Sequence, residues 1–134
     1  MRPDITKKIE RIRYYLTLLQ TYKKECEERF EKDPMFEGAV LHYLYLVADG
    51  CISLAEMTLK HKGLGPAQSY YEAIDMLGDY GILPRDFAYR FAKIASFRNF
   101  LAHDYEAIEA KLICEALMKR LEEVHTFLGF IEKA

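Results

Sequence analysis

Apolar residues recur along this chain at intervals of three and four, the spacing that places side chains on one face of an α-helix. Pro3 and Asp4 predict a helix start, because proline suits a first helical turn and aspartate caps its free N–H groups. Asp33 and Pro34 end this helix and begin the next, since the residue before a proline is disfavoured in helical geometry. The first apolar stripe has one gap, at Lys23, and consists of Ile5, Ile9, Ile12, Leu16, Leu19, Cys26 and Phe30.

The second predicted helix, from residue 34 to about residue 60, is apolar over more than half of its circumference. It is therefore expected to be the central, most buried helix, or to face a partner as well as its own core. Its pattern stops at residues 61–66, where two glycines and a proline break it. The two adjacent stripes are Val40, Leu44, Val47, Cys51, Leu54 and Thr58, and Tyr43, Leu46, Ile52, Ala55 and Leu59.

Three further helices follow. Ser69 is expected to cap a short helix through Leu77, which Gly78 and Gly81 end. Pro84 starts a fourth helix, whose inward residues are Phe87, Phe91, Ile94 and Phe97 or Leu101, and whose pattern weakens at residues 103–105. The last helix carries Ile108, Leu112, Leu117, Leu121, Val124, Leu128 and Ile131. Short connections between about five helices predict an all-α antiparallel bundle that forms one domain over residues 1–134.

Composition and charge agree with a folded, cytoplasmic domain. Hydrophobic residues make up 51% and charged residues 30% of 134 residues, and the net charge is -2. This charge lacks the basic excess of proteins that hold nucleic acid by broad phosphate neutralisation, so an RNA contact would be local. No run of roughly 18 apolar residues predicts a membrane helix. Cys26, Cys51 and Cys114 lie within helical patterns and are expected to be reduced, apolar side chains.

Neither a metal site nor a cofactor is expected. His42, His61 and His125 fall on separate predicted elements, and the cysteines have no neighbouring base in the sequence that would activate them. The tyrosines leave two interpretations open, a stacking surface for bases or contacts at the core edge and a dimer interface, of which we expect the second. These tyrosines are Tyr14, Tyr15, Tyr70, Tyr71 and Tyr80.

Polar groups of unlike chemistry interrupt the apolar pattern of the fourth helix at Arg98, Asn99 and His103. Asn99 and His103 are four residues apart and share a helical face, while Arg98 and Tyr105 are seven apart and share another. On a regular helix Arg98 and His103 point about 140° away from each other. The reach of the arginine, or an unwinding near His103, would be needed to bring the two side chains to one cleft.

Arginine and histidine together suit metal-free cleavage of RNA. A permanently charged guanidinium stabilises charge developing on phosphorus, and an imidazole removes the proton of the ribose 2′-hydroxyl. The local sequence alone favours a structural role instead, in which Arg98 and Asn99 hydrogen-bond helix-end carbonyls and His103 is a satisfied terminal residue. Tyr105 would then cover the core edge.

The arrangement of Arg98, His103 and Tyr105 resembles the Arg-x4-His-x-Tyr signature of the HepT-like (DUF86) branch of the HEPN family. Residues 39–56, 65–66, 69–74 and 77–83, and Ile108 soon after the motif, also resemble that branch. The resemblance implies a homodimeric helical bundle in which the two Arg/His sets line a cleft at the interface.

The resemblance further implies the toxin of a toxin–antitoxin pair, a ribonuclease that cleaves RNA and not DNA. Arg98 and His103 would be its catalytic pair, and Asn99 a supporting residue. The implied partner is an MntA-like nucleotidyltransferase antitoxin that attaches AMP to Tyr105, where the added anion would block the phosphate site. The alternative is a non-catalytic module that binds a nucleotide and a nucleotidyltransferase partner. The negative net charge of the chain and the small number of candidate catalytic residues favour this alternative.

Overall fold

The computed structural model describes residues 2–103 and 109–134, and for residues 116–119 the backbone alone. Every regular element in these ranges is helical, which confirms the predicted all-α class. The predictions for Tyr105 and Ile108 lie outside the described residues. The elements are α1 (Pro3–Tyr22), a 3₁₀ turn η1 (Lys23–Glu25), α2 (Cys26–Arg29), α3 (Pro34–His61), α4 (Tyr70–Asp79), α5 (Arg85–Phe91), α6 (Ile94–His103) and α7 (Ala110–Lys133).

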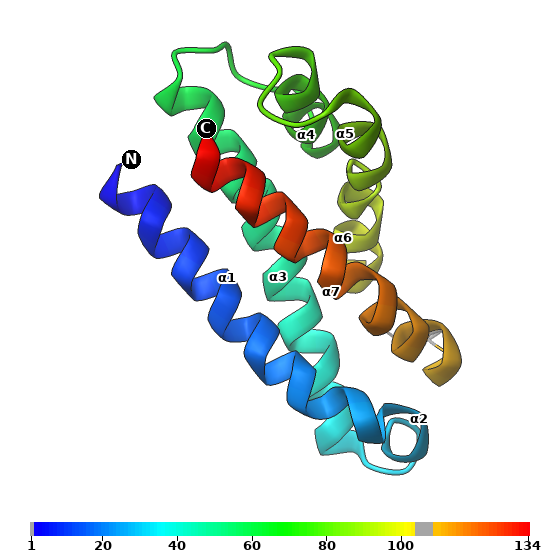
Figure 1. The fold of residues 1–134 in the computed structure, drawn as a ribbon. Helices are drawn as coiled ribbons and strands as arrows, with labels where there is room; N and C mark the ends of the chain where they lie inside the picture. The colour runs from blue at the N-terminus through cyan, green and yellow to red at the C-terminus, as the bar shows by residue number, and fades with distance from the viewer. Residues whose placement is uncertain (1, 104–108) are drawn as a thin grey trace.

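The long helices α1, α3 and α7 run side by side, with α1 antiparallel to both α3 and α7 (Figure 1). Helix α3 is central, as predicted, because it packs against α1, α4, α6 and α7. Helices α4 and α5 pack on each other at the end where both termini lie, and α2 lies at the opposite end, against α7. The segment that contains Arg98 therefore runs along the most buried helix of the fold.

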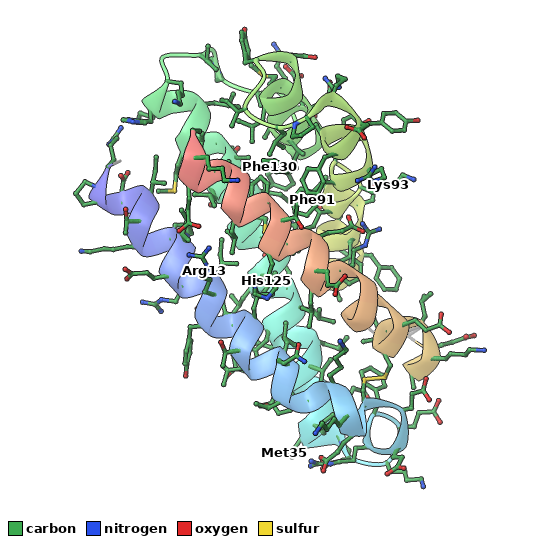
Figure 2. All side chains as sticks on the ribbon, in the orientation of Figure 1. Arg13, Met35, Phe91, Lys93, His125 and Phe130 are labelled. Carbon is green, nitrogen blue, oxygen red and sulfur yellow. A yellow bond between two sulfur atoms is a disulfide. The ribbon has the colours of Figure 1, made fainter. Side chains whose placement is uncertain are left out.

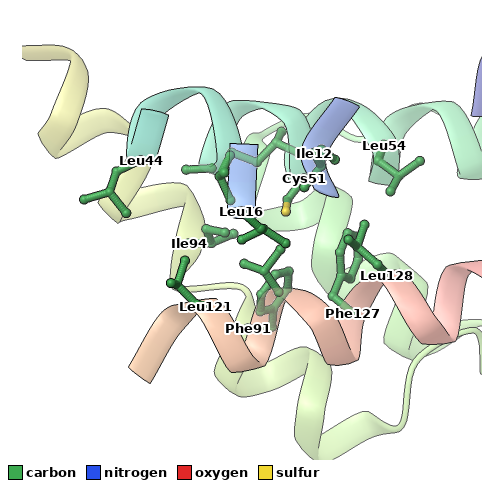
Figure 3. Packing of buried hydrophobic residues seen from close by; sticks show 14 of the residues in the cluster. Ile12, Leu16, Leu44, Cys51, Leu54, Phe91, Ile94, Leu121, Phe127 and Leu128 are labelled. Carbon is green, nitrogen blue, oxygen red and sulfur yellow. The ribbon is translucent and has the colours of Figure 1, made fainter. Parts of the chain in front are cut away.

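One continuous hydrophobic core fills the bundle (Figure 3). At its centre the rings of Phe91 and Phe127 stack with centroids 4.7 Å apart, joining α5 to α7. Helix α3 is also long and apolar enough to cross a membrane by length and composition, with a mean hydropathy of 1.4 over its best 18-residue window. Of that window, 56% is buried inside the bundle, and the core helix of a soluble protein has the same composition.

The predicted helix starts at residues 34 and 70 are confirmed by their caps. The Asp33 carboxylate accepts hydrogen bonds from the backbone N–H groups of Met35 and Phe36 at 3.1 and 3.2 Å. A hydrogen bond from Arg29 and those backbone donors hold the pKa of Asp33 below its usual value. The Ser69 hydroxyl accepts from the backbone N–H of Glu72 at 3.0 Å.

Three predicted helix boundaries are wrong. The first helix is interrupted by η1, which begins at Lys23, the one gap in its apolar stripe. The fourth is divided into α5 and α6 at residues 92–93. Helix α4 continues through Gly78, because this glycine is a packing residue: a Cβ there would lie 2.6 Å from the Cβ of Ala88 on α5. With each interrupted helix counted once, the predicted bundle of about five helices is recovered.

The prediction of three reduced cysteines is wrong for two of them. Cys26 on α2 and Cys114 on α7 form a disulfide with Cα atoms 5.7 Å apart (the yellow bond in Figure 2). They are 88 residues apart in the sequence, and only the packing of α2 on α7 brings them together. Cys51 is free and buried as predicted, and burial raises the pKa of its thiol.

Candidate functional site

Arg98 on α6 points toward α3 rather than toward solvent, and its side chain is only 16% exposed. Its Nε donates a hydrogen bond to Asp49 Oδ1 at 3.1 Å, and its Nη2 donates to the Tyr45 hydroxyl at 3.0 Å. Tyr45 and Asp49 are four residues apart on α3 and so lie on one face of it. This face of α3 fixes the position of the guanidinium.

Two aromatic rings also contact the guanidinium. Its central carbon lies 5.2 Å from the ring centroid of Tyr45 and 4.9 Å from that of Tyr70. Both distances are within the range of cation–π attraction. Because Tyr70 is the first residue of α4, three helices meet around Arg98. Contacts from several helices hold the Arg98 guanidinium in one orientation.

The surroundings of Arg98 keep it charged. Burial lowers its pKa, but the hydrogen bond to Asp49 and the favourable interactions with Tyr45, Tyr70 and Asp49 outweigh this, so the pKa is raised overall. A guanidinium has five N–H donors, and the described residues use one on each of the three nitrogens. One N–H remains on each terminal nitrogen, which is what a two-point contact with phosphate oxygens requires.

Two other predicted site residues that the structure describes, Asn99 and His103, lie on the solvent side of α6. Asn99 is exposed, and its Oδ1 accepts from Arg98 Nη1 at 3.2 Å. His103 is exposed and is the last residue of α6, which stays helical up to that point instead of unwinding. No hydrogen bond between described residues joins His103 to Arg98. Within one chain, a hydrogen bond thus joins Arg98 to Asn99, whereas His103 lies five residues further on, at the exposed end of α6.

An open cleft of about 450 Å³ lies beside Arg98, between the start of α4 and α6. It is lined by Gln68, Ser69, Tyr70, Tyr71, Ala95, Ser96 and Asn99. A second, apolar groove of about 500 Å³ lies on the α7 side of α6 and is lined by Lys93, Ser96, Phe97, Phe100, Leu112, Ile113 and Arg120. In the described part of the chain, no group of three or more His, Cys, Asp and Glu residues is placed to hold a metal ion.

Sequence reasoning missed Asp49 and Tyr45, the two residues of α3 that hold Arg98. A signal was present, because Asp49 is the one carboxylate between Glu37 and Glu56 in an apolar helix. Acidic residues seldom lie in such a stretch without a charged partner. What the sequence could not indicate was which cation would meet it, since Asp49 and Arg98 are 49 residues apart.

A helical bundle that holds a charged arginine beside an open, aromatic-lined cleft defines a small all-α protein with a candidate site for an anion. The chain belongs to the HepT-like ribonuclease family: the family model described as "Ribonuclease HepT-like" matches residues 5–131. The resemblance noted in the sequence is thereby confirmed.

Two curated relatives match most of the chain. The mRNA nuclease HepT of Shewanella oneidensis is 21% identical over 104 residues, covering 78% of each protein. A protein of Archaeoglobus fulgidus named as a candidate RNase is 27% identical over 126 residues, covering 93% of this chain and 88% of the relative.

Solved structures confirm the fold. The tri-AMPylated HEPN toxin of Shewanella oneidensis, solved in complex with its MNT antitoxin, superposes with a TM-score of 0.88 at 21% identity over 100% of both chains. YutE of Bacillus subtilis, described as a cytosolic protein of unknown function, gives a TM-score of 0.81 at 16% identity over 98% of this chain and 88% of YutE.

Proposed function

We propose that this protein is a metal-independent endoribonuclease and the toxin component of a toxin–antitoxin pair that acts in the cytoplasm. The observation that carries the proposal is the arginine of the motif. Arg98 is charged, is held by Asp49 and Tyr45, and has one N–H on each terminal nitrogen that no described residue uses. The relative named mRNA nuclease HepT supports RNA as the substrate.

In the proposed reaction, His103 takes the proton of a ribose 2′-hydroxyl, and the 2′-oxygen attacks the adjacent phosphorus. Arg98 binds the phosphate oxygens and stabilises the negative charge that develops on them, with Asn99 supporting its orientation. The bond from phosphorus to the 5′-oxygen breaks, and the leaving oxygen takes a proton from water. The products are a 2′,3′-cyclic phosphate and a 5′-hydroxyl end.

The site is proposed to be assembled in a homodimer, with Arg98 of one copy facing His103 of the other. The separation of these side chains within one chain supports this arrangement, because α6 holds them on different faces. The apolar groove beside α6 also supports a contact with a second copy, since Leu112 at its edge is 57% exposed. A two-fold axis would then create two equivalent sites.

The proposed antitoxin is an MntA-like nucleotidyltransferase that transfers AMP from ATP to Tyr105. The phenol oxygen attacks the α-phosphorus, and pyrophosphate leaves. Tyr105 follows Arg98 by seven residues in the sequence, and the negative charge of the added phosphate would compete with and repel RNA. The solved relative is a tri-AMPylated toxin bound to an MNT antitoxin, which supports this mode of control.

The test of the function is cleavage of single-stranded RNA by the purified protein in excess EDTA. We expect cleavage to continue and to yield cyclic-phosphate ends, because the proposed chemistry uses the 2′-hydroxyl and no metal. The matched substrate carries a 2′-O-methyl group at the cleaved position and should resist, as should DNA of the same sequence. Cleavage that stops in EDTA, or that leaves 5′-phosphate ends, would contradict the proposal.

Growth of a bacterial host separates the enzyme from a binding module. Expression of the enzyme alone arrests growth, and co-expression of the nucleotidyltransferase restores it. Harmless expression together with tight binding of the nucleotidyltransferase would favour the non-catalytic nucleotide-binding module instead.

Asp49 is expected to act as a positioning residue for Arg98. Replacing Asp49 with leucine removes the acceptor for Arg98 Nε, and we expect kcat to fall about 10- to 100-fold as the guanidinium loses its orientation. Asp49→Asn keeps an acceptor oxygen and should recover part of this loss. Steady-state kinetics and thermal unfolding of both variants provide the measurement.

The control for Asp49 is Asp86→Asn, which removes an exposed carboxylate on α5 that pairs with Arg90 at 3.7 Å. It should leave kcat unchanged. Equal kcat values for Asp49→Leu, Asp49→Asn and the wild type would show that Arg98 does not depend on this contact.

A further inference from the structure

The proposed reaction assigns no part of the substrate to the cleft between the start of α4 and α6, yet the cleft adjoins the proposed phosphate-binding group. Asn99 lines the cleft and accepts a hydrogen bond from Arg98. Tyr70 also lines it and contacts the Arg98 guanidinium, with 4.9 Å between that carbon and the ring centroid. A molecule in the cleft would therefore be a direct neighbour of a phosphate held by Arg98.

The lining of the cleft suits a flat heterocycle with polar edges. Tyr71 presents an aromatic ring that is 43% exposed, and such rings stack on nucleobases of any sequence. Gln68, Ser96 and Asn99 supply amide and hydroxyl groups that both donate and accept hydrogen bonds. Among the described residues, those that line the cleft include no carboxylate that would repel the RNA backbone. Its volume of about 450 Å³ is typical of sites for small organic groups.

We propose that this cleft is a nucleobase subsite, in which an unpaired base next to the cleaved phosphate stacks on Tyr71. The inference rests on the proposed ribonuclease function and specifies its substrate class. Arg98 already lies against the Tyr70 ring, so the base stacks on the ring of Tyr71. The side chains of Gln68, Ser96 and Asn99 contact the edge of the base. In a duplex the bases are stacked inside the helix and cannot enter, so the substrate is single-stranded or looped RNA.

The position of Tyr71 distinguishes it from other exposed tyrosines. Tyr14 on α1 and Tyr89 on α5 are 59% and 64% exposed, but neither lines the cleft beside Arg98. Tyr89→Ala is therefore a matched control for Tyr71→Ala: both remove an exposed ring from a helix of the same bundle. Tyr71→Phe keeps the ring and loses only the hydroxyl.

The experiment measures binding of a single-stranded RNA that carries 2′-O-methyl at the cleaved position, together with KM for its cleavable form. We expect Tyr71→Ala to raise Kd and KM about 5- to 150-fold, the usual contribution of one stacked base. Tyr71→Phe and Tyr89→Ala should stay within about twofold, since stacking needs the ring alone. Thermal unfolding checks that each variant is folded, and Tyr71→Leu serves if the alanine variant is not.

A second arm removes the base instead of the tyrosine. An RNA with an abasic residue beside the cleaved phosphate should bind the wild type at least as weakly as intact RNA binds Tyr71→Ala, because it loses the base-edge contacts as well as the stacking. Tyr71→Ala should weaken binding of the abasic RNA little further, because the stacking contact is already absent. A hairpin stem of the same sequence should bind more weakly than the single strand.

The outcomes separate the two proposals. If the wild type cleaves RNA and Tyr71→Ala has the wild-type Kd and KM, the subsite is wrong and the ribonuclease function stands. If the wild type binds the RNA through Tyr71 but never cuts it, the subsite stands and the ribonuclease function is wrong. If the wild type binds no RNA, both are wrong.

Discussion

Replacing either Arg98 or His103 with alanine is expected to abolish measurable RNA cleavage while the bundle stays folded. Loss of a general base costs about 10²- to 10⁴-fold, and loss of a preorganised cation costs about as much as loss of an oxyanion donor, 10²- to 10³-fold. Arg98→Lys should also fail: lysine keeps the charge but lacks the planar fork that contacts Asp49, Tyr45 and a phosphate together. The measurement is single-turnover cleavage of labelled RNA.

Two exposed residues outside the site provide matched controls. Arg90→Ala on α5 removes an exposed guanidinium, and His125→Ala on α7 removes an exposed imidazole. Both variants should cleave RNA at the wild-type rate. Wild-type rates in the Arg98 and His103 variants as well would show that the cleavage chemistry lies elsewhere in the protein.

Mixing the two inactive variants tests where the catalytic pair is assembled. If Arg98 of one copy acts with His103 of the other, each mixed dimer contains one intact site and one site that lacks both residues. After random exchange of equal amounts, about half of the dimers are mixed, so about a quarter of wild-type activity should return. No recovery would place both residues of each site on the same chain.

The fold was predictable wherever local rules decide it. Asp33 and Ser69 indicated helix starts that the structure confirms, because their caps involve residues two or three positions away. The gap at Lys23 is visible in the sequence, but the pattern predicts one continuous helix, whereas the chain forms a 3₁₀ turn there. Local rules predict a helix end at Gly78, because the sequence does not show the close approach of Ala88 from α5.

For the candidate site, the sequence indicated the residues of the motif but not their surroundings. The pattern around Arg98 predicts a phosphate-binding cation, and regular helix geometry predicts that Arg98 and His103 point away from each other; α6 is helical as far as His103. The groups that contact Arg98 come from α3 and α4. Tyr45 and Asp49 on α3 are 53 and 49 residues away from Arg98 in the sequence. The spacing of apolar residues predicts which face of a helix is buried, but it does not predict which residues of other helices contact that face.

Removing the Cys26–Cys114 disulfide is expected to lower the free energy of unfolding by about 4–5 kcal/mol. The bond joins residues 88 apart, and closing a loop of that length restricts the unfolded chain by this amount in the chain-entropy description. The double variant Cys26→Ala/Cys114→Ala should therefore unfold at a clearly lower denaturant concentration than the oxidised wild type. Protein concentration must be equal in all samples, since a dimer gains stability from association.

Reductant provides the second half of this test and bears on the proposed cytoplasmic location. The side chains of Cys26 and Cys114 are 1% and 5% exposed, so a thiol reductant reaches the disulfide only after α2 separates from α7. Reduction should be slow in native buffer and fast in denaturant, and it should lower the midpoint of the wild type toward that of the double variant. The double variant should not respond to reductant. An unfolding midpoint of the wild type that is the same with and without reductant in denaturant would show that the two sulfurs are not bonded in the purified protein.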